Sequence, residues 1–262
     1  MLDRPRKAKL SPTIKAGWLI FIFALYSYGT CAHAADPPSN VLCRPDLASS
    51  RRLELADKLR EITGWPSVSF DEQGALRFGG VPVGGSETAR DLLMAAASGN
   101  NVCVIEDASN HADTVFCRVV EGRWTKRASQ KPPVYLVLVD FADFKHVTGD
   151  QAALAAFNVG WGFLHELAHV VYDYPDAEGA DGAGECESLI NRMRRECGLA
   201  ERADYFFDFF PGAEQSPFMT RLVRLAFDQQ SATTNKKKRY WVMWDANIVG
   251  GLEQPRQLAT KR

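Results

Sequence analysis

The residues 160–176, "GWGFLHELAHVVYDYPD", place two histidines four positions apart and a glutamate directly after the first histidine. On an α-helix, positions i and i+4 lie on one face, so His165 and His169 can present imidazole nitrogens to one metal ion. Glu166 is rotated by about 100° from His165, which keeps it out of the ligand set and lets it reach a water beside the metal. The pattern therefore predicts a helix that carries a site for one metal ion.

The residues around the two histidines form an apolar collar that suits such a site. The uncharged neighbours are Leu164, Leu167, Ala168, Val170 and Val171. A low-dielectric surrounding strengthens the electrostatics of a metal-held water. With only 5 histidines in the chain, a chance match to H-E-x-x-H is roughly a one-in-a-hundred event, which favours metal binding. In zinc metalloproteases with this motif, the glutamate acts as general base.

Two histidines are not a complete ligand set, because catalytic zinc usually has three protein ligands and a water. No histidine follows His169, and the upstream ones are His33, His111 and His146. The H-x-x-G-x-x-H extension of the metzincins is absent, with Tyr172 at the position of its glycine. A carboxylate downstream of His169 is the best remaining source of the third ligand.

Residues 185–191, "ECESLIN", supply such carboxylates, and here the sequence resembles the gluzincins, HExxH metallopeptidases whose third ligand is a glutamate on a later helix. In thermolysin-like members a small residue follows that glutamate, and an acid four places on hydrogen-bonds a zinc histidine. Glu187 is followed by Ser188, with Asn191 four places on, so the resemblance implies Glu187 as third ligand. Asn191 departs from the acid of the pattern. Glu185 stays open as the competing ligand.

The resemblance covers residues 160–195 and implies an exported zinc-dependent peptidase with one Zn²⁺ per chain. His165, His169 and Glu187 would hold the metal, and Glu166 would move a proton from the attacking water to the leaving amine. Two other functions stay open: a non-catalytic exported zinc-binding or interaction protein, and a zinc hydrolase of non-peptide amides.

The implied substrate is a peptide or protein, which would pair with a sheet edge within residues 101–106 or 114–120. Several side chains are available to stabilise a developing oxyanion, and the sequence singles out none of them: Tyr172, Tyr205, Tyr240, Arg192 and Arg194.

The N-terminus has the order of a secretory signal. A basic segment is followed by the short apolar run "AGWLIFIFALYSYG" and by "AHA" at 32–34, which predicts a signal peptide over residues 1–34 and a mature start at Ala35. Lipidation at Cys31 ranks below simple secretion, because Thr30 stands where a lipobox has a smaller residue. We expect a periplasmic or secreted protein without stable membrane insertion once the signal is removed.

The cysteines of an exported chain are candidates for disulfides. Cys103 and Cys117 flank the hairpin-like stretch "CVIEDASNHADTVFC", so the sequence predicts that they pair. Cys186 and Cys197 are eleven residues apart on one expected helix, too far to bond to each other.

The order of expected elements predicts an α+β fold. The resemblance implies a zincin-like arrangement, with a small sheet on a long active-site helix and a helical C-terminal part. Strands are expected at 67–78, as a hairpin, at 101–107 paired with 113–120, and at 132–141. Helices are expected at 51–63 and 86–97, and one long helix from Asp150 to Tyr172. Residues 35–50 are expected as a leader and 51–262 as one catalytic domain. The net charge of −1 gives no reason to expect nucleic acid as partner.

Overall fold

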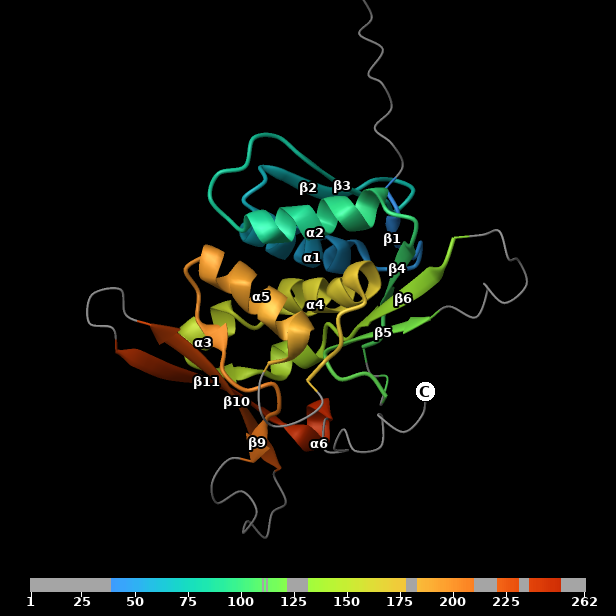
Figure 1. Ribbon diagram of the computed structural model, residues 1–262. Coiled ribbons are helices and arrows are strands. Elements are labelled where there is room, and N and C mark those ends of the chain that lie inside the picture. The colour runs from blue at the N-terminus through green and yellow to red at the C-terminus, as the bar shows by residue number, and fades with distance from the viewer. Residues whose placement is uncertain are drawn as a thin grey trace, which may run out of the picture. The chain divides into compact units, whose positions relative to one another are not determined.

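The computed structural model of the protein is a mixed α/β fold with small sheets and several helices (Figure 1). It describes residues 39–109, 111, 113–121, 132–177, 183–209, 221–230 and 236–250. The expected signal peptide and the start at Ala35 lie outside this range. Among the described residues, no helix combines the length and apolarity that crossing a membrane requires.

The main sheet has the strand order β1-β4-β6-β5. Its strands β1 (Val41–Cys43), β4 (Val102–Asp107) and β6 (Val134–Val139) are parallel, and β5 (Cys117–Glu121) runs antiparallel at one edge. The apolar run of β6 gives this strand its interior place. The expected direct pairing of 101–107 with 113–120 is wrong, because β6 lies between these strands.

The N-terminal boundary of the fold also differs from the expectation. The segment 35–50 was expected as a leader, but its residues 41–43 form β1, which pairs with β4 in the main sheet. Val41 is fully buried there. The apolar residues Val41, Leu42 and Cys43 therefore form an edge strand of the sheet and belong to the fold, which includes residues before 51.

The expected disulfide between Cys103 and Cys117 is wrong, and both residues carry free thiols. Cys103 pairs with Tyr135 on one side of β6, whereas Cys117 pairs with Val139 on the other side. The two cysteines are thus separated by a whole strand and by four residues along it. The stretch between them is not a simple hairpin, which is why the sequence spacing misled.

The first two helices follow the sequence pattern. The helix α1 (Ser49–Thr63) buries Leu55, Leu59 and Ile62, and α2 (Glu87–Ser98) is capped by Ser86, whose hydroxyl accepts from the backbone N–H of Ala89 at 2.9 Å. The expected hairpin is confirmed as β2 (Ser67–Phe70) and β3 (Leu76–Gly79), which pair antiparallel.

The long helix expected from Asp150 to Tyr172 is divided into α3 (Gln151–Ala155) and α4 (Val159–Tyr172). The side chain of Asn158 caps α4 by accepting from the backbone N–H of Gly160 at 3.0 Å. Asp150 precedes α3 without capping it through its side chain, and its carboxylate instead accepts from the backbone N–H of Trp241 at 2.8 Å. The H-E-x-x-H helix α4 is therefore a separate helix, which begins at the N-cap Asn158.

Two glycines allow α4 to pack closely against its neighbours. A Cβ on Gly160 would lie 2.8 Å from Cβ of Lys58 in α1, and a Cβ on Gly162 would lie 2.8 Å from Sγ of Cys117 in β5. A side chain at either position would collide with these neighbouring side chains, so glycine lets the elements approach this closely. The glycines thus bring the edge strand β5 against the helix that carries the histidines, with α5 on another side of it (Figure 1).

The C-terminal part is mostly a sheet, so the expected helical C-terminal part is correct only for α5 (Gly184–Glu196) and the short α6 (Ala246–Val249). The remaining elements are the 3₁₀ helix η2 and the five strands of a second sheet: η2 (Asp143–His146), β7 (Thr148–Gly149), β8 (Glu201–Arg202), β9 (Asp208–Phe209), β10 (Leu222–Gln230) and β11 (Lys237–Asp245). Val223, Phe227 and Val242 are buried in a second apolar core beneath the β10–β11 hairpin.

Asp143, a buried acid that contacts the backbone directly before the edge strand β5, leads to a stability prediction. The carboxylate of Asp143 accepts from the backbone N–H of Phe116 at 2.9 Å, and burial raises the pKa of Asp143 from 3.8 to about 6. The charged form is therefore disfavoured in the folded state, so this group lowers stability as pH rises from about 4 to about 6. Asp143→Asn keeps the acceptor and removes the charge. Urea unfolding should show a gain of about 1–3 kcal/mol at pH 8 and almost none at pH 4; an equal effect at both would contradict the assignment.

Candidate metal centre

The two histidines of α4 face the same carboxylate. Nε2 of His165 lies 3.0 Å from Oδ1 of Asp176, and Nε2 of His169 lies 3.3 Å from the same oxygen. Asp176 stands in the loop after α4, which turns back at Asp173, a residue in the left-handed region with φ 54°. The helix therefore supplies two nitrogens on one face, and the turn behind it supplies an oxygen to both.

These separations fit a metal ion. Donor atoms about 2.0–2.1 Å from a tetrahedral zinc lie about 3.3–3.4 Å from one another, close to the two distances that join Asp176 to the histidines. The other nitrogen of His169, Nδ1, lies 2.6 Å from the backbone oxygen of Tyr174. This bond fixes the ring so that Nε2 of His169 faces Asp176, as in metal sites whose histidines are oriented by outer partners.

Glu187, the expected third ligand, lies on the other side of His165. Its Oε2 is 3.3 Å from Nδ1 of His165, not beside the Nε2 atoms that converge on Asp176. Glu185, the competing candidate, is exposed on α5. The distances therefore favour Asp176 over both glutamates as the third ligand. Glu187 lies behind His165, in the outer position that the gluzincin pattern gives to the residue at 191.

Two arginines hold Glu187 in this position. Its Oε1 accepts a short hydrogen bond from Arg194, and its Oε2 accepts from Nη1 of Arg202 at 3.1 Å. The side chains of Glu187 and Arg194 are only 1% and 3% exposed. Asn191 joins the network by accepting from Arg194 at 2.8 Å. A buried carboxylate with this many charged partners is fixed in one orientation.

Cys186 contributes a fourth donor atom. One ligand atom from each of His165, His169, Asp176 and Cys186 lies within 4.8 Å of the other three. The thiol of Cys186 is fully buried and donates to the backbone oxygen of His165 at 3.2 Å. Three of the four residues therefore match a histidine–carboxylate site, and the fourth donor atom is the buried sulfur of Cys186.

The protonation of the group links it to metal binding. Burial lowers the pKa of His169, but the carboxylate of Asp176 and the side chain of Cys186 outweigh it and raise this pKa to about 10. Burial raises the pKa of Asp176, and its hydrogen bonds to both histidines bring the pKa well below its usual range. Without metal the site is thus an ion pair of an aspartate and imidazolium. A metal must displace these protons, so its affinity should rise with pH.

Glu166 lies outside the converging group, as its position on the helix predicts. Its side chain is buried, and its Oε2 accepts from the backbone N–H of Val119 in β5 at 2.8 Å. Burial raises the pKa of Glu166, and the neighbouring histidines oppose this effect. The edge strand therefore fixes the carboxylate next to the two histidines without bringing it into their ligand set.

Tyr205 is the one of the five candidate oxyanion donors whose ring lies beside a histidine of the metal centre. Its ring stacks beside the ring of His165 with centroids 6.3 Å apart. Burial raises the pKa of Tyr205, and the negative charge of Asp176 raises it further. Arg194 is committed to Glu187, and Arg192 pairs with Glu196 at 3.4 Å. Tyr205 is thus a protonated donor at neutral pH.

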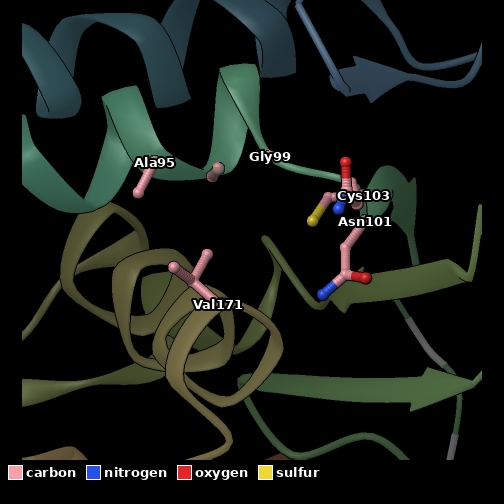
Figure 2. Close-up of a pocket in the computed structure, with 7 residues that line it drawn as sticks. Ala95, Gly99, Asn101, Cys103 and Val171 are labelled. Carbon is pink, nitrogen blue, oxygen red and sulfur yellow. The ribbon is translucent and has the colours of Figure 1, made fainter.

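A separate hollow of about 270 Å³ lies between the end of α2 and α4 (Figure 2). Its lining residues are Ala95, Ala96, Gly99, Asn100, Asn101, Cys103 and Val171. The only ionisable group in this lining is the thiol of Cys103, whose pKa burial raises to about 12. The side-chain amide of Asn101 donates to the backbone oxygen of Val170 at 2.8 Å. The residues that line this hollow therefore offer no group that is charged at neutral pH for binding or catalysis.

Comparisons with known proteins return no match among protein families, curated proteins or solved structures. The interpretation of the site therefore depends on its residues. Asp176 was not predicted as a ligand, because the gluzincin pattern points to a glutamate on a later helix. The signal in the sequence was a carboxylate only seven residues after His169, next to Pro175.

Proposed function

We propose that the protein is a zinc-dependent hydrolase that cleaves peptide bonds, with His165, His169 and Asp176 as metal ligands and Glu166 as general base. The observation that carries the proposal is the convergence of both histidine Nε2 atoms on one oxygen of Asp176 at 3.0 and 3.3 Å. The H-E-x-x-H spacing that creates this convergence also places Glu166 beside it. One zinc ion per chain is expected.

Zinc held by these residues would supply a Lewis acid that polarises a carbonyl and lowers the pKa of water toward about 7. Glu166 would accept the proton of the attacking water and deliver it to the leaving amine. Its raised pKa suits this exchange, because a base is most effective when its pKa approaches the working pH. Tyr205, whose ring lies beside that of His165, would donate its hydroxyl proton to a developing negative charge.

The edge strand β5 is the proposed docking site for an extended peptide. It is the last strand in the order of the main sheet, and its Val119 directs a backbone N–H away from β6 to Glu166. An extended substrate that adds to this edge would lie along the general base. Of the two stretches expected to bind substrate, 101–106 lies inside the sheet between β1 and β6, which leaves 114–120.

The direct test is cleavage of a mixed peptide library by the zinc-loaded protein, before and after chelation. We expect cleavage that disappears with the chelator and returns when zinc is added in equimolar amount. A protein that binds one zinc per chain tightly and cleaves no peptide would contradict the peptidase proposal. Screening the same sample on non-peptide amides then separates the alternative hydrolase from a binding protein.

The buried thiol of Cys186 favours a second candidate, a non-catalytic zinc-binding protein. Structural zinc sites are closed by four protein ligands, whereas catalytic sites keep one position open. If Cys186 completes the set, cobalt(II) in place of zinc should show a sulfur-to-metal charge-transfer band in the near ultraviolet that Cys186→Ala abolishes. We expect no such band, because the thiol is already committed to the backbone oxygen of His165.

A further inference from the structure

We propose that Arg202 is a positioning residue for the metal centre and that it holds His165 in place through Glu187 and through the ring of Tyr205. The inference depends on the proposed metal site, because it concerns how tightly that site holds its ion. Arg202 lies on β8, in the C-terminal sheet, and its side chain is 18% exposed. It contacts neither the substrate edge nor a metal ligand directly in the contacts described, so its effect must pass through its two neighbours.

The first connection runs through a single carboxylate oxygen. Nη1 of Arg202 donates to Oε2 of Glu187 at 3.1 Å, and the same oxygen lies 3.3 Å from Nδ1 of His165. A carboxylate at Nδ1 fixes the ring so that Nε2 faces the metal, and it makes the imidazole a stronger ligand. Arg194 holds the other oxygen of Glu187. Arg202 is therefore the partner on the side of the carboxylate that touches the histidine.

The second connection runs through Tyr205. Nη2 of Arg202 donates a short hydrogen bond to the backbone oxygen of Tyr205, and the guanidinium carbon lies 4.8 Å from the centroid of the Tyr205 ring. The ring itself lies beside the ring of His165, with the two centroids 6.3 Å apart. One guanidinium thus supports both neighbours of His165, the carboxylate of Glu187 and the ring of Tyr205.

Two hydrogen bonds to Asn191 hold the backbone of Arg202 and so fix the point from which its side chain extends. Its N–H donates to Oδ1 of Asn191 at 2.7 Å, and its carbonyl accepts from Nδ2 of Asn191 at 2.9 Å. Its Nε donates to the backbone oxygen of Asp204 at 3.2 Å. All three nitrogens of the guanidinium are thus used, in three directions. A lysine ammonium, a single point charge, does not reproduce this planar fork.

The test compares Arg202→Ala and Arg202→Lys with Arg195→Ala as matched control. Arg195 belongs to the neighbouring helix, its side chain is 60% exposed, and its only described ion-pair partner is Glu201 at 2.5 Å. The measurements are the zinc dissociation constant at several pH values, the visible spectrum of bound cobalt(II), and the thermal unfolding of each metal-free protein. They require no cleavage activity.

We expect Arg202→Ala to weaken zinc binding by about 10–100-fold, as loss of outer partners typically does. Arg202→Lys should fall between alanine and wild type, and Arg195→Ala should match wild type. The cobalt spectrum of both Arg202 variants should broaden or shift, because His165 loses its fixed orientation. Guanidinium ion at low millimolar concentration should restore part of the zinc affinity of Arg202→Ala.

Folded variants with wild-type zinc affinity and an unchanged cobalt spectrum would overturn the proposal. If Arg202→Ala does not fold, Arg202→Lys decides in the same way, since it keeps the charge beside Glu187. If the wild-type protein binds zinc but cleaves no peptide, the peptidase proposal is contradicted and the role of Arg202 is not affected. If His165→Ala binds zinc as tightly as wild type does, both proposals are contradicted.

Discussion

Replacing Glu166 with glutamine is expected to lower peptide cleavage by about 10²–10⁴-fold while zinc stays bound. Glu166 is absent from the group of donor atoms that converge on Asp176, so its loss should leave the metal content unchanged. Glutamine keeps an oxygen that can accept from the N–H of Val119, the contact that now orients the carboxylate at 2.8 Å. The fold should therefore persist, and only the ability to take a proton from water should be lost.

The matched control is Glu185→Gln, which removes the same charge from an exposed position on α5. Cleavage rate, zinc content and thermal unfolding are measured for wild type and both variants. Equal cleavage by Glu166→Gln and wild type would remove Glu166 from the role of general base. A Glu166→Gln protein that also loses its zinc would mean that this carboxylate contributes to the metal site itself.

Replacing Asp176 with asparagine is expected to weaken zinc binding by more than about 100-fold, beyond the 10–100-fold typical of outer partners. Asp176 is the only described carboxylate within reach of both Nε2 atoms, at 3.0 and 3.3 Å. Its side chain is 45% exposed, so the substitution should not disturb the core. Asparagine has a similar shape but lacks the charge that zinc favours. Peptide cleavage should be lost with the metal.

Two further variants separate the third ligand from its alternatives. Asp173→Asn removes a charge from the same turn, at a left-handed residue that asparagine tolerates, and should bind zinc as wild type does. Glu187→Gln should weaken zinc by only about 10–100-fold, as an outer partner. Zinc dissociation constants and melting temperatures are measured for all three. A larger loss for Glu187→Gln than for Asp176→Asn, with both proteins folded, would return the ligand role to Glu187.

Local patterns were sufficient to predict the elements that depend on neighbouring residues. The H-E-x-x-H spacing predicted that His165 and His169 share a face with Glu166 beside them, because helix periodicity alone decides this. The cap at Ser86 and the hairpin of β2 and β3 are of the same kind. The break of the long helix at Asn158 was not predicted. The apolar, alanine-rich residues around Asn158 favour a continuous helix, and an asparagine within such a stretch does not by itself show whether it caps a new helix.

Features that depend on contacts distant in sequence could not be predicted in this way. The insertion of β6 between β4 and β5 separates Cys103 from Cys117 and brings β5 to the sheet edge. The choice between Asp176 and Glu187 depends on where a turn and a later helix meet α4. Glu187 has the pattern of a ligand in sequence, but Arg194 and Arg202, seven and fifteen residues away, hold its carboxylate at Nδ1 of His165.

The most direct test is a crystal structure of the zinc-loaded protein, with the ion located by its anomalous scattering. We predict a single zinc bonded to Nε2 of His165, Nε2 of His169 and a carboxylate oxygen of Asp176, with water in the fourth position facing Glu166. A zinc bonded to Glu187 in place of Asp176, or closed by the sulfur of Cys186 with no water bound, would contradict this account.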